Sequence, residues 1–290
     1  MTSVYDWVMD DKDELVGWQK AAGPTVYLLG MAVCVGFIWS TGNVIGDVSC
    51  RFRLSYSPRN GAFGIWGVLF PWHFASIFFQ FLTNLSPETF YAAKFESNVL
   101  MAIAWAASGI WTFFFTTADS PDPAAGLGFA AFFLIVAATS AFSAVFLENG
   151  FGTNASTAQI FIVSIPFSLL ASWLVVAASI SVGVFVKSMN FVNGTNSSTT
   201  EITAPACQRD PANPSEPLIP PPEGWIDLLV PLVLALAISA ATISQSDLVL
   251  ALPIIWAISF MRLDAVKVVS IAVLIVCTIV AWVRFFMTRT

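Results

Sequence analysis

The sequence predicts an all-α fold, a polytopic bundle of transmembrane helices with a five-helix core and about three additional helices. The chain repeatedly becomes apolar for about 20 residues with almost no charge, and a helix of that length crosses the roughly 30 Å hydrocarbon layer of a bilayer. The composition is 57% hydrophobic and 10% charged, where ordinary soluble domains have about 25% charged residues. The mean hydropathy of +0.78 agrees. These observations exclude water-soluble enzyme folds.

Eight stretches are apolar enough to be interpreted as helices. In chain order they cover residues 24–40, 62–83, 97–117, 125–147, 159–187, 226–244, 246–261 and 265–286. Eight crossings would place both termini on the same side of the membrane. The seventh stretch is short and contains Pro253, so a re-entrant or tilted segment is the alternative, with the C-terminus then on the opposite side.

This division predicts four regions: an acidic tail at 1–23, a five-helix membrane core at 24–187, a loop at 188–225 and C-terminal membrane helices at 226–290. The acidic tail disfavours nucleic acid and anionic lipid surfaces as partners. It also lacks the basic-then-apolar order of a signal peptide, so the first apolar stretch is expected to be retained. The loop is rich in proline, serine and asparagine, which favours extended backbone of the polyproline type.

The membrane orientation stays open at this level. Seven basic residues flank the stretches on the side opposite the N-terminus, and five flank them on the N-terminal side. This difference weakly favours the side opposite the N-terminus as the cytoplasmic one. Cys50 and Cys207 both lie on that opposite side, where they would pair if the compartment is oxidising. Two free thiols are the alternative. Glycosylation sequons occur on both sides and do not decide the matter.

Three of the first five stretches carry short motifs built around a tryptophan. The second stretch contains the motif residues Phe63, Trp66 and Phe70, which Pro58 precedes. The third stretch contains Ser108, Trp111 and the run Phe113–Phe115, and the fifth contains Pro166, Phe167, Trp173 and Ala177. In order and approximate spacing these motifs resemble those of the tryptophan-rich TspO/MBR-like family, which comprises the translocator (peripheral benzodiazepine receptor) proteins. The resemblance covers about residues 24–187.

The resemblance implies a five-helix bundle around a cavity that binds porphyrins, sterols or aromatic drugs, with the loop at 41–61 as its lid. Phe70 stands where the family has tyrosine and Ser108 where it has asparagine, so polar groups are missing from matched positions and no particular ligand is implied. Pro253–Ala257 resembles the tail of a longer, divergent branch. The ligand-binding candidates that the matched positions imply are Phe63, Trp66, Phe70, Ser108, Trp111, Trp173 and Ala177.

His73 is the only histidine and lies inside the second stretch. An imidazole in hydrocarbon needs a polar partner, so His73 is also a ligand-binding candidate. At helical spacing Trp66, Phe70 and His73 share one face, on which a flat aromatic ligand could stack. His73 would then be its hydrogen-bond partner or an axial haem ligand. The alternative is a structural histidine bonded to a hydroxyl or carbonyl of a neighbouring helix.

Other residues with distinctive chemistry favour structural roles. Trp39 lies near the end of a stretch, where indole prefers the membrane interface, and Trp105 lies deeper. Cys34 is expected to be a small packing residue. The centres of the stretches carry almost no charge, and the sequence contains no metal-ligand cluster, phosphate loop or catalytic triad. Catalytic residues, metals and cofactors are therefore not expected, and the protein is not expected to be an enzyme.

The function predicted is that of an integral, multi-pass membrane protein binding a hydrophobic or flat aromatic small molecule of the tetrapyrrole or sterol class. It would act as a sensor or a transport accessory. Two alternatives stay open: a scaffold or assembly subunit of a membrane complex, whose small-residue helix faces pack against other proteins, and a carrier of a small neutral solute. The expected partners are the lipid bilayer, such a ligand, and a homodimer partner or a membrane complex. Nucleic acid is not expected, and the sequence does not indicate which membrane holds the protein.

Overall fold

The fold is a helical membrane bundle, seen in the residues that the computed structural model describes. These are residues 4–41, 60–85, 93–116, 123–148, 159–194, 209–210, 213–217 and 252–259, with isolated positions at 48, 54, 249, 275, 279 and 280. Within them, five helices are long and apolar enough to cross a membrane. The all-α, multi-pass membrane architecture predicted from hydropathy is confirmed.

The five long helices correspond to the first five predicted stretches. They are α1 (Val4–Thr41), α3 (Trp66–Leu85), α4 (Phe95–Thr116), α5 (Pro123–Leu147) and α7 (Ile165–Gly194). A 3-10 helix, η1 (Asn60–Ile65), precedes α3, and a π-helix, η3 (Ile160–Ser164), precedes α7. Two boundaries differ from expectation: α1 begins at Val4, within the region expected as a tail, and α7 continues beyond residue 187 to Gly194.

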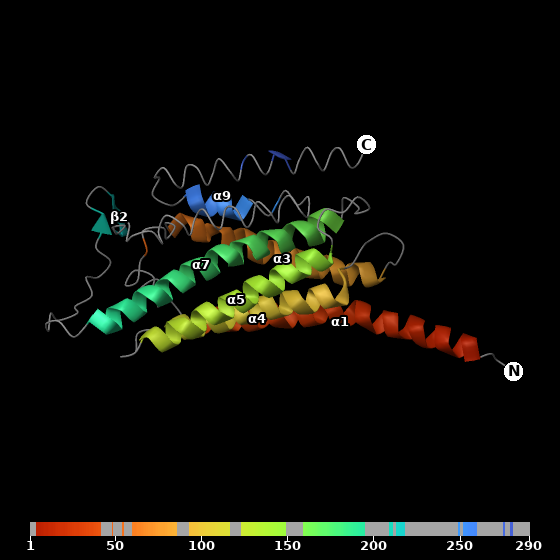
Figure 1. Cartoon of the computed structure of the whole chain (residues 1–290). Helices are drawn as coiled ribbons and strands as arrows, with labels where there is room; N and C mark the ends of the chain where they lie inside the picture. Colours follow the sequence, from red (N-terminus) through yellow and green to blue (C-terminus); the bar gives the residue numbers. More distant parts are fainter. Residues whose placement is uncertain are drawn as a thin grey trace.

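The helices pack as a ring whose order is not the order of the chain. Helix α4 packs along α1 on one side and α5 on the other, α5 packs along α7, and α3 closes the ring between α7 and α1. Figure 1 shows α1, α4, α5 and α7 side by side. Side chains that point inward from helices far apart in sequence therefore meet at the centre of the ring.

Two glycines bring α1 and α4 into backbone contact. A Cβ atom on Gly30 of α1 would lie 2.5 Å from Cα of Ala102 in α4, and one on Gly109 of α4 would lie 2.7 Å from Cα of Cys34 in α1. Neither position has room for a side chain. Since apolar side chains gain little by leaving lipid for a helix interface, close backbone packing of this kind is what stabilises the helix pair.

The start of α7 contains a backbone irregularity that α3 compensates. In the π-helical turn the Ile165 N–H bonds the carbonyl oxygen of Ile160 rather than that of Phe161. Pro166 has no N–H to offer, so the Phe161 carbonyl loses its backbone donor. The indole Nε1–H of Trp72 in α3 donates to this carbonyl at 2.9 Å. The hydrogen bond satisfies a group that hydrocarbon could not, and it ties α3 to α7.

The C-terminal third is described only in part. Helix α9 (Leu252–Ser259) falls within the predicted stretch 246–261 and contacts α7 and η1. The predicted stretches 226–244 and 265–286 lie outside the described residues, apart from isolated positions. The loop at 188–225 contains an antiparallel hairpin, β1 (Arg209–Asp210) and β2 (Asn213–Pro217), where extended backbone alone was expected. A two-stranded hairpin consists of edge strands only, which tolerate proline.

Candidate ligand cavity

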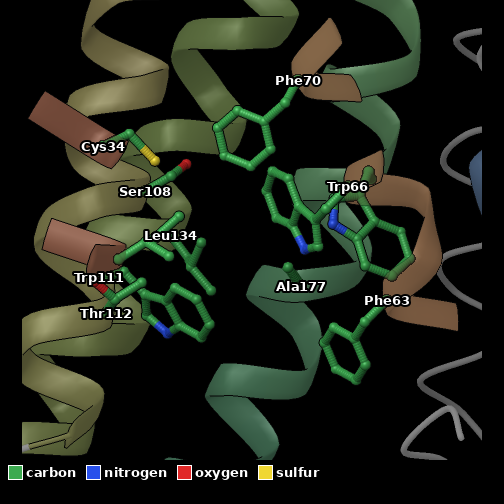
Figure 2. A pocket seen from close by; sticks show the side chains of 11 residues that line it. Cys34, Phe63, Trp66, Phe70, Ser108, Trp111, Thr112, Leu134 and Ala177 are labelled. Atoms are coloured by element: carbon green, nitrogen blue, oxygen red, sulfur yellow. The ribbon is translucent and has the colours of Figure 1, made fainter. Parts of the chain in front are cut away.

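A cavity of about 270 Å³ lies inside the ring. The five long helices and η1 all contribute to its wall, and Figure 2 shows labelled side chains from different helices pointing toward the same space. The volume equals roughly nine water molecules at liquid density. The lining residues are Cys34, Ile38, Phe63, Trp66, Phe70, Ser108, Trp111, Thr112, Leu134, Trp173 and Ala177.

Seven of the eight candidate residues from the sequence line this one cavity. They come from η1, α3, α4 and α7, so the motifs of the second, third and fifth stretches converge in space as the resemblance implied. Their contact with a ligand stays a prediction. The seven residues are Phe63, Trp66, Phe70, Ser108, Trp111, Trp173 and Ala177.

Aromatic rings form much of the wall and hold one another at fixed angles. The rings of Trp66 and Trp173 meet edge to face, with centroids 6.3 Å apart and planes at 89°. Phe63 meets Trp173 in the same way at 6.2 Å and 88°, and Phe70 lies 5.6 Å from Trp66. Edge-to-face contacts favour these orientations, so the rings of the wall brace one another.

Two hydroxyls of the wall are engaged within their own helix, whereas the indole Nε1–H groups of Trp111 and Trp173 are buried without a hydrogen-bond partner among the described residues. The Ser108 hydroxyl donates to the carbonyl oxygen of Ala104 at 2.7 Å, and the Thr112 hydroxyl donates to that of Gly109 at 2.7 Å. Both hydroxyls keep lone pairs but have no hydrogen left for a ligand. The described lining residues carry no formal charge. A wall of this chemistry suits an uncharged, mostly apolar ligand.

His73 does not line the cavity. It lies one helical turn beyond Phe70, is fully buried, and its Nδ1 is hydrogen-bonded to the hydroxyl of Tyr27 in α1. Its ring stacks parallel to Phe167 at 6.3 Å and meets Trp105 at 5.1 Å. The hydrogen bond to a hydroxyl of a neighbouring helix, which the structural alternative expects, is present, and contact of His73 with a ligand stays a prediction.

Sequence reasoning missed four lining residues. Thr112 follows Ser108 by one helical turn, and Ile38 follows Cys34 by one turn, so helical spacing could have indicated each pair once one member was known. Cys34 was expected only to pack; it is buried and also forms part of the wall. Leu134 carries no sequence signal that separates it from other apolar residues of α5.

Several expectations fall largely outside the described residues. Of the loop expected as a lid, the structure describes Val48 and Leu54 between α1 and η1, and both are buried in the core. Pairing of Cys50 with Cys207, use of the sequons, and the membrane orientation stay predictions. Trp39, the next-to-last residue of its predicted stretch, is 88% exposed, as an interfacial indole would be.

The sequence model of the family described as TSPO-like protein matches residues 23–205. This range includes every residue that lines the cavity and, apart from the first two residues of the span Ala21–Thr41, the membrane-spanning segments of all five helices in the ring. Searches among curated proteins and among solved structures found no match.

Proposed function

The chain belongs to the TSPO-like protein family, as its tryptophan motifs predicted, and on this premise we propose that its five-helix ring binds a flat, mostly apolar small molecule. It is an integral, multi-pass membrane protein. The ligand would enter the ring from the bilayer or from the membrane surface. The proposed role is that of a sensor or a transport accessory, without catalysis.

The observation that carries the proposal is the convergence of five aromatic side chains on one uncharged cavity. Phe63, Trp66, Phe70, Trp111 and Trp173 come from three separate motifs and line the same space. Pockets for small ligands are typically apolar and aromatic, with a few polar groups that orient the ligand. Cavities left by imperfect packing cost stability, so one lined by so many large side chains calls for a functional explanation.

The cavity is smaller than either of the two expected ligand classes, the tetrapyrroles and the sterols, requires. Its volume of about 270 Å³ lies just below the range of roughly 300–1,000 Å³ that is usual for pockets holding drug-sized molecules. A tetrapyrrole or a sterol would therefore bind only after the wall moves. Ile38 and Phe63 are the lining residues best placed to move, because they are 37% and 43% exposed and so reach both the cavity and the outer surface.

Quenching of tryptophan fluorescence by protoporphyrin IX tests the proposal on purified protein in detergent or nanodiscs. We expect saturable quenching, because Trp66, Trp111 and Trp173 lie on the wall. Ala177→Phe places a ring in the cavity and should weaken binding at least tenfold. Ala32→Phe adds the same ring on the exposed face of α1 and should leave binding unchanged. Equal affinity for all three proteins, or quenching that never saturates, would refute the proposal.

Cys34 offers a second readout that does not depend on fluorescence. It is buried on the cavity wall, so an alkylating reagent reaches it through the cavity. In a variant that keeps Cys34 and carries serine at the other three cysteine positions, saturating protoporphyrin should slow alkylation by N-ethylmaleimide. An unchanged alkylation rate at saturating ligand would place the porphyrin elsewhere on the protein.

A further inference from the structure

The ring of helices has its least extensive contacts on the two sides of α3. Helix α4 packs along α1 and α5, and α5 packs along α7, whereas α3 meets α1 and α7 in much smaller contacts. Helices in a bilayer are held together by close packing rather than by the burial of apolar surface, so the smallest contacts are the easiest to separate. Movement of α3, together with η1 that precedes it, is therefore the easiest way to open the cavity.

The contact between η1 and α7, which we call the η1–α7 joint, lies directly beside the cavity. The ring of Phe63 in η1 crosses this joint and meets Trp173 of α7, and both residues line the cavity. Phe63 is 43% exposed, whereas Trp173 is 1% exposed. The Phe63 side chain therefore lies between the cavity and the outer surface of the ring. A molecule that passes between η1 and α7 has to displace this side chain.

Helix α9 packs across the η1–α7 joint from the outside. It contacts both η1 and α7, and Figure 1 shows it beside the ring. Pro253 and Ala257, one helical turn apart, are buried, and Ile255 packs against the core. Leu252 is 51% exposed. One face of α9 thus lies against the ring, while another face points away from it.

Two features make α9 a cover of the ring rather than a part of the cavity wall. No described residue of α9 lines the cavity, and α9 lies outside residues 23–205, the range that the family model matches. The helix has eight residues, and helices shorter than about 12–15 residues are only marginally stable on their own. Since α9 keeps its position by packing on η1 and α7, a small change at that contact can displace it.

We propose that α9 is a clasp over the η1–α7 joint, and that its displacement opens an entrance through which the ligand passes Phe63 into the cavity. This inference rests on the proposed ligand-binding function. It adds a route of entry and a means of controlling the rate of binding. A clasp that leaves the cavity wall unchanged alters how fast a ligand enters and leaves, but not how tightly the ligand binds.

Stopped-flow quenching of tryptophan fluorescence by protoporphyrin IX measures both rates on the full-length protein in nanodiscs. Ala257 is fully buried, so Ala257→Phe forces α9 away from the ring. We expect the association and dissociation rate constants both to rise about fivefold, which corresponds to about 1 kcal/mol of lost α9 packing, with a change in Kd of less than about twofold. Leu252→Phe places the same ring on the exposed face of α9 and should leave both rate constants at the wild-type values.

Alkylation of Cys34 by N-ethylmaleimide tests the entrance without a ligand. Cys34 is buried in the cavity wall, so the reagent has to enter the ring before it reacts. All proteins in this experiment carry serine at the other three cysteine positions. Ala257→Phe should raise the alkylation rate by the same factor as the porphyrin rates, and Leu252→Phe should leave the alkylation rate unchanged.

Two further variants keep the test decisive. Ile255→Ala removes part of the α9 packing without adding bulk, and it should speed porphyrin binding and Cys34 alkylation even if Ala257→Phe fails to fold. Glu148→Ala removes the carboxylate that accepts the backbone N–H of Lys94, so it loosens the bundle between α4 and α5 instead. It should leave the porphyrin rates and the alkylation rate unchanged.

The outcomes separate the clasp from the proposed function. If Ala257→Phe and Ile255→Ala react at wild-type rates while porphyrin binds saturably, the clasp is overturned and the ligand-binding function stands. Rates that rise equally in Glu148→Ala would assign the effect to general loosening of the bundle and would also overturn the clasp. If porphyrin never binds saturably to wild-type protein, the proposed function is refuted, and the alkylation rates alone decide whether α9 covers an entrance.

Discussion

Replacement of Gly30 by alanine should destabilise the bundle, whereas the same replacement at Gly36 in the same helix should not. Both residues lie in α1, but a Cβ on Gly30 would lie 2.5 Å and 2.7 Å from the Cα and carbonyl carbon of Ala102, and a Cβ on Gly36 would meet nothing within 4 Å. Alanine adds the same single methyl group and the same gain in helix propensity at both sites. The difference between the two variants therefore isolates the cost of separating α1 from α4.

The magnitude follows from the contact distances. Ordinary contact with a Cβ begins near 3.4 Å, so Gly30→Ala forces the two backbones apart by about 1 Å. Overpacking of this kind costs about 1–3 kcal/mol, and the helix-propensity gain of about 1 kcal/mol is common to both variants. We expect Gly30→Ala to be less stable than Gly36→Ala by about 2 kcal/mol, which corresponds to a Tm difference of roughly 3 °C for a chain of this size.

Thermal unfolding of the two variants in one detergent, followed by the loss of monodisperse protein in size-exclusion chromatography, measures this difference. Gly109→Ala is an independent replicate from the other side of the interface, because its Cβ would lie 2.7 Å from Cα of Cys34. We expect the same loss there. If Gly30→Ala and Gly109→Ala both melt at or above the temperature of Gly36→Ala, then α1 and α4 do not pack by backbone contact and the ring described above is wrong.

Two further substitutions test hydrogen bonds between neighbouring helices of the ring. Trp72→Phe removes the only described donor to the Phe161 carbonyl and should cost about 1–3 kcal/mol, whereas Trp39→Phe at an exposed position should be neutral; equal Tm values for the two variants would contradict the assignment. Glu148→Ala should cost about 1 kcal/mol, because a Glu148 carboxylate oxygen accepts the backbone N–H of Lys94 at 2.7 Å just before α4 begins. Glu148→Gln keeps an acceptor oxygen and should recover most of that stability, so a glutamine variant as unstable as the alanine variant would refute the capping role.

The membrane-spanning segments were largely predictable because their signal is local. A run of apolar residues without charge specifies a helix that crosses the bilayer, and the first five predicted stretches coincide with the long helices α1, α3, α4, α5 and α7. The motif residues were predictable as a set because the family resemblance supplied their grouping. The π-helical turn before Pro166 was not, since it depends on a donor from Trp72, 89 residues away.

The inward-facing side of each helix was harder to predict. In a soluble protein, apolar residues face inward and polar residues face water, but a bilayer is as apolar as the bundle interior, so hydropathy does not distinguish the two directions. On α3, Phe70 faces the cavity while Phe78 and Phe79 are exposed on the outside of the bundle, and the sequence gives all three the same chemistry. His73 shows the same limit, because its polar partner, Tyr27, belongs to another helix.

The amino-acid sequence alone determined that this protein lies in a membrane, where its first five helices run, and to which family it is related, because each of these depends on residues that are near one another in the chain. The tertiary structure decided that Cys34, Thr112 and Leu134 join the tryptophans around one cavity and that His73 lies behind it. Those facts depend on how closely α1 approaches α4 and on which helices close the ring, and such contacts form only between segments distant in sequence.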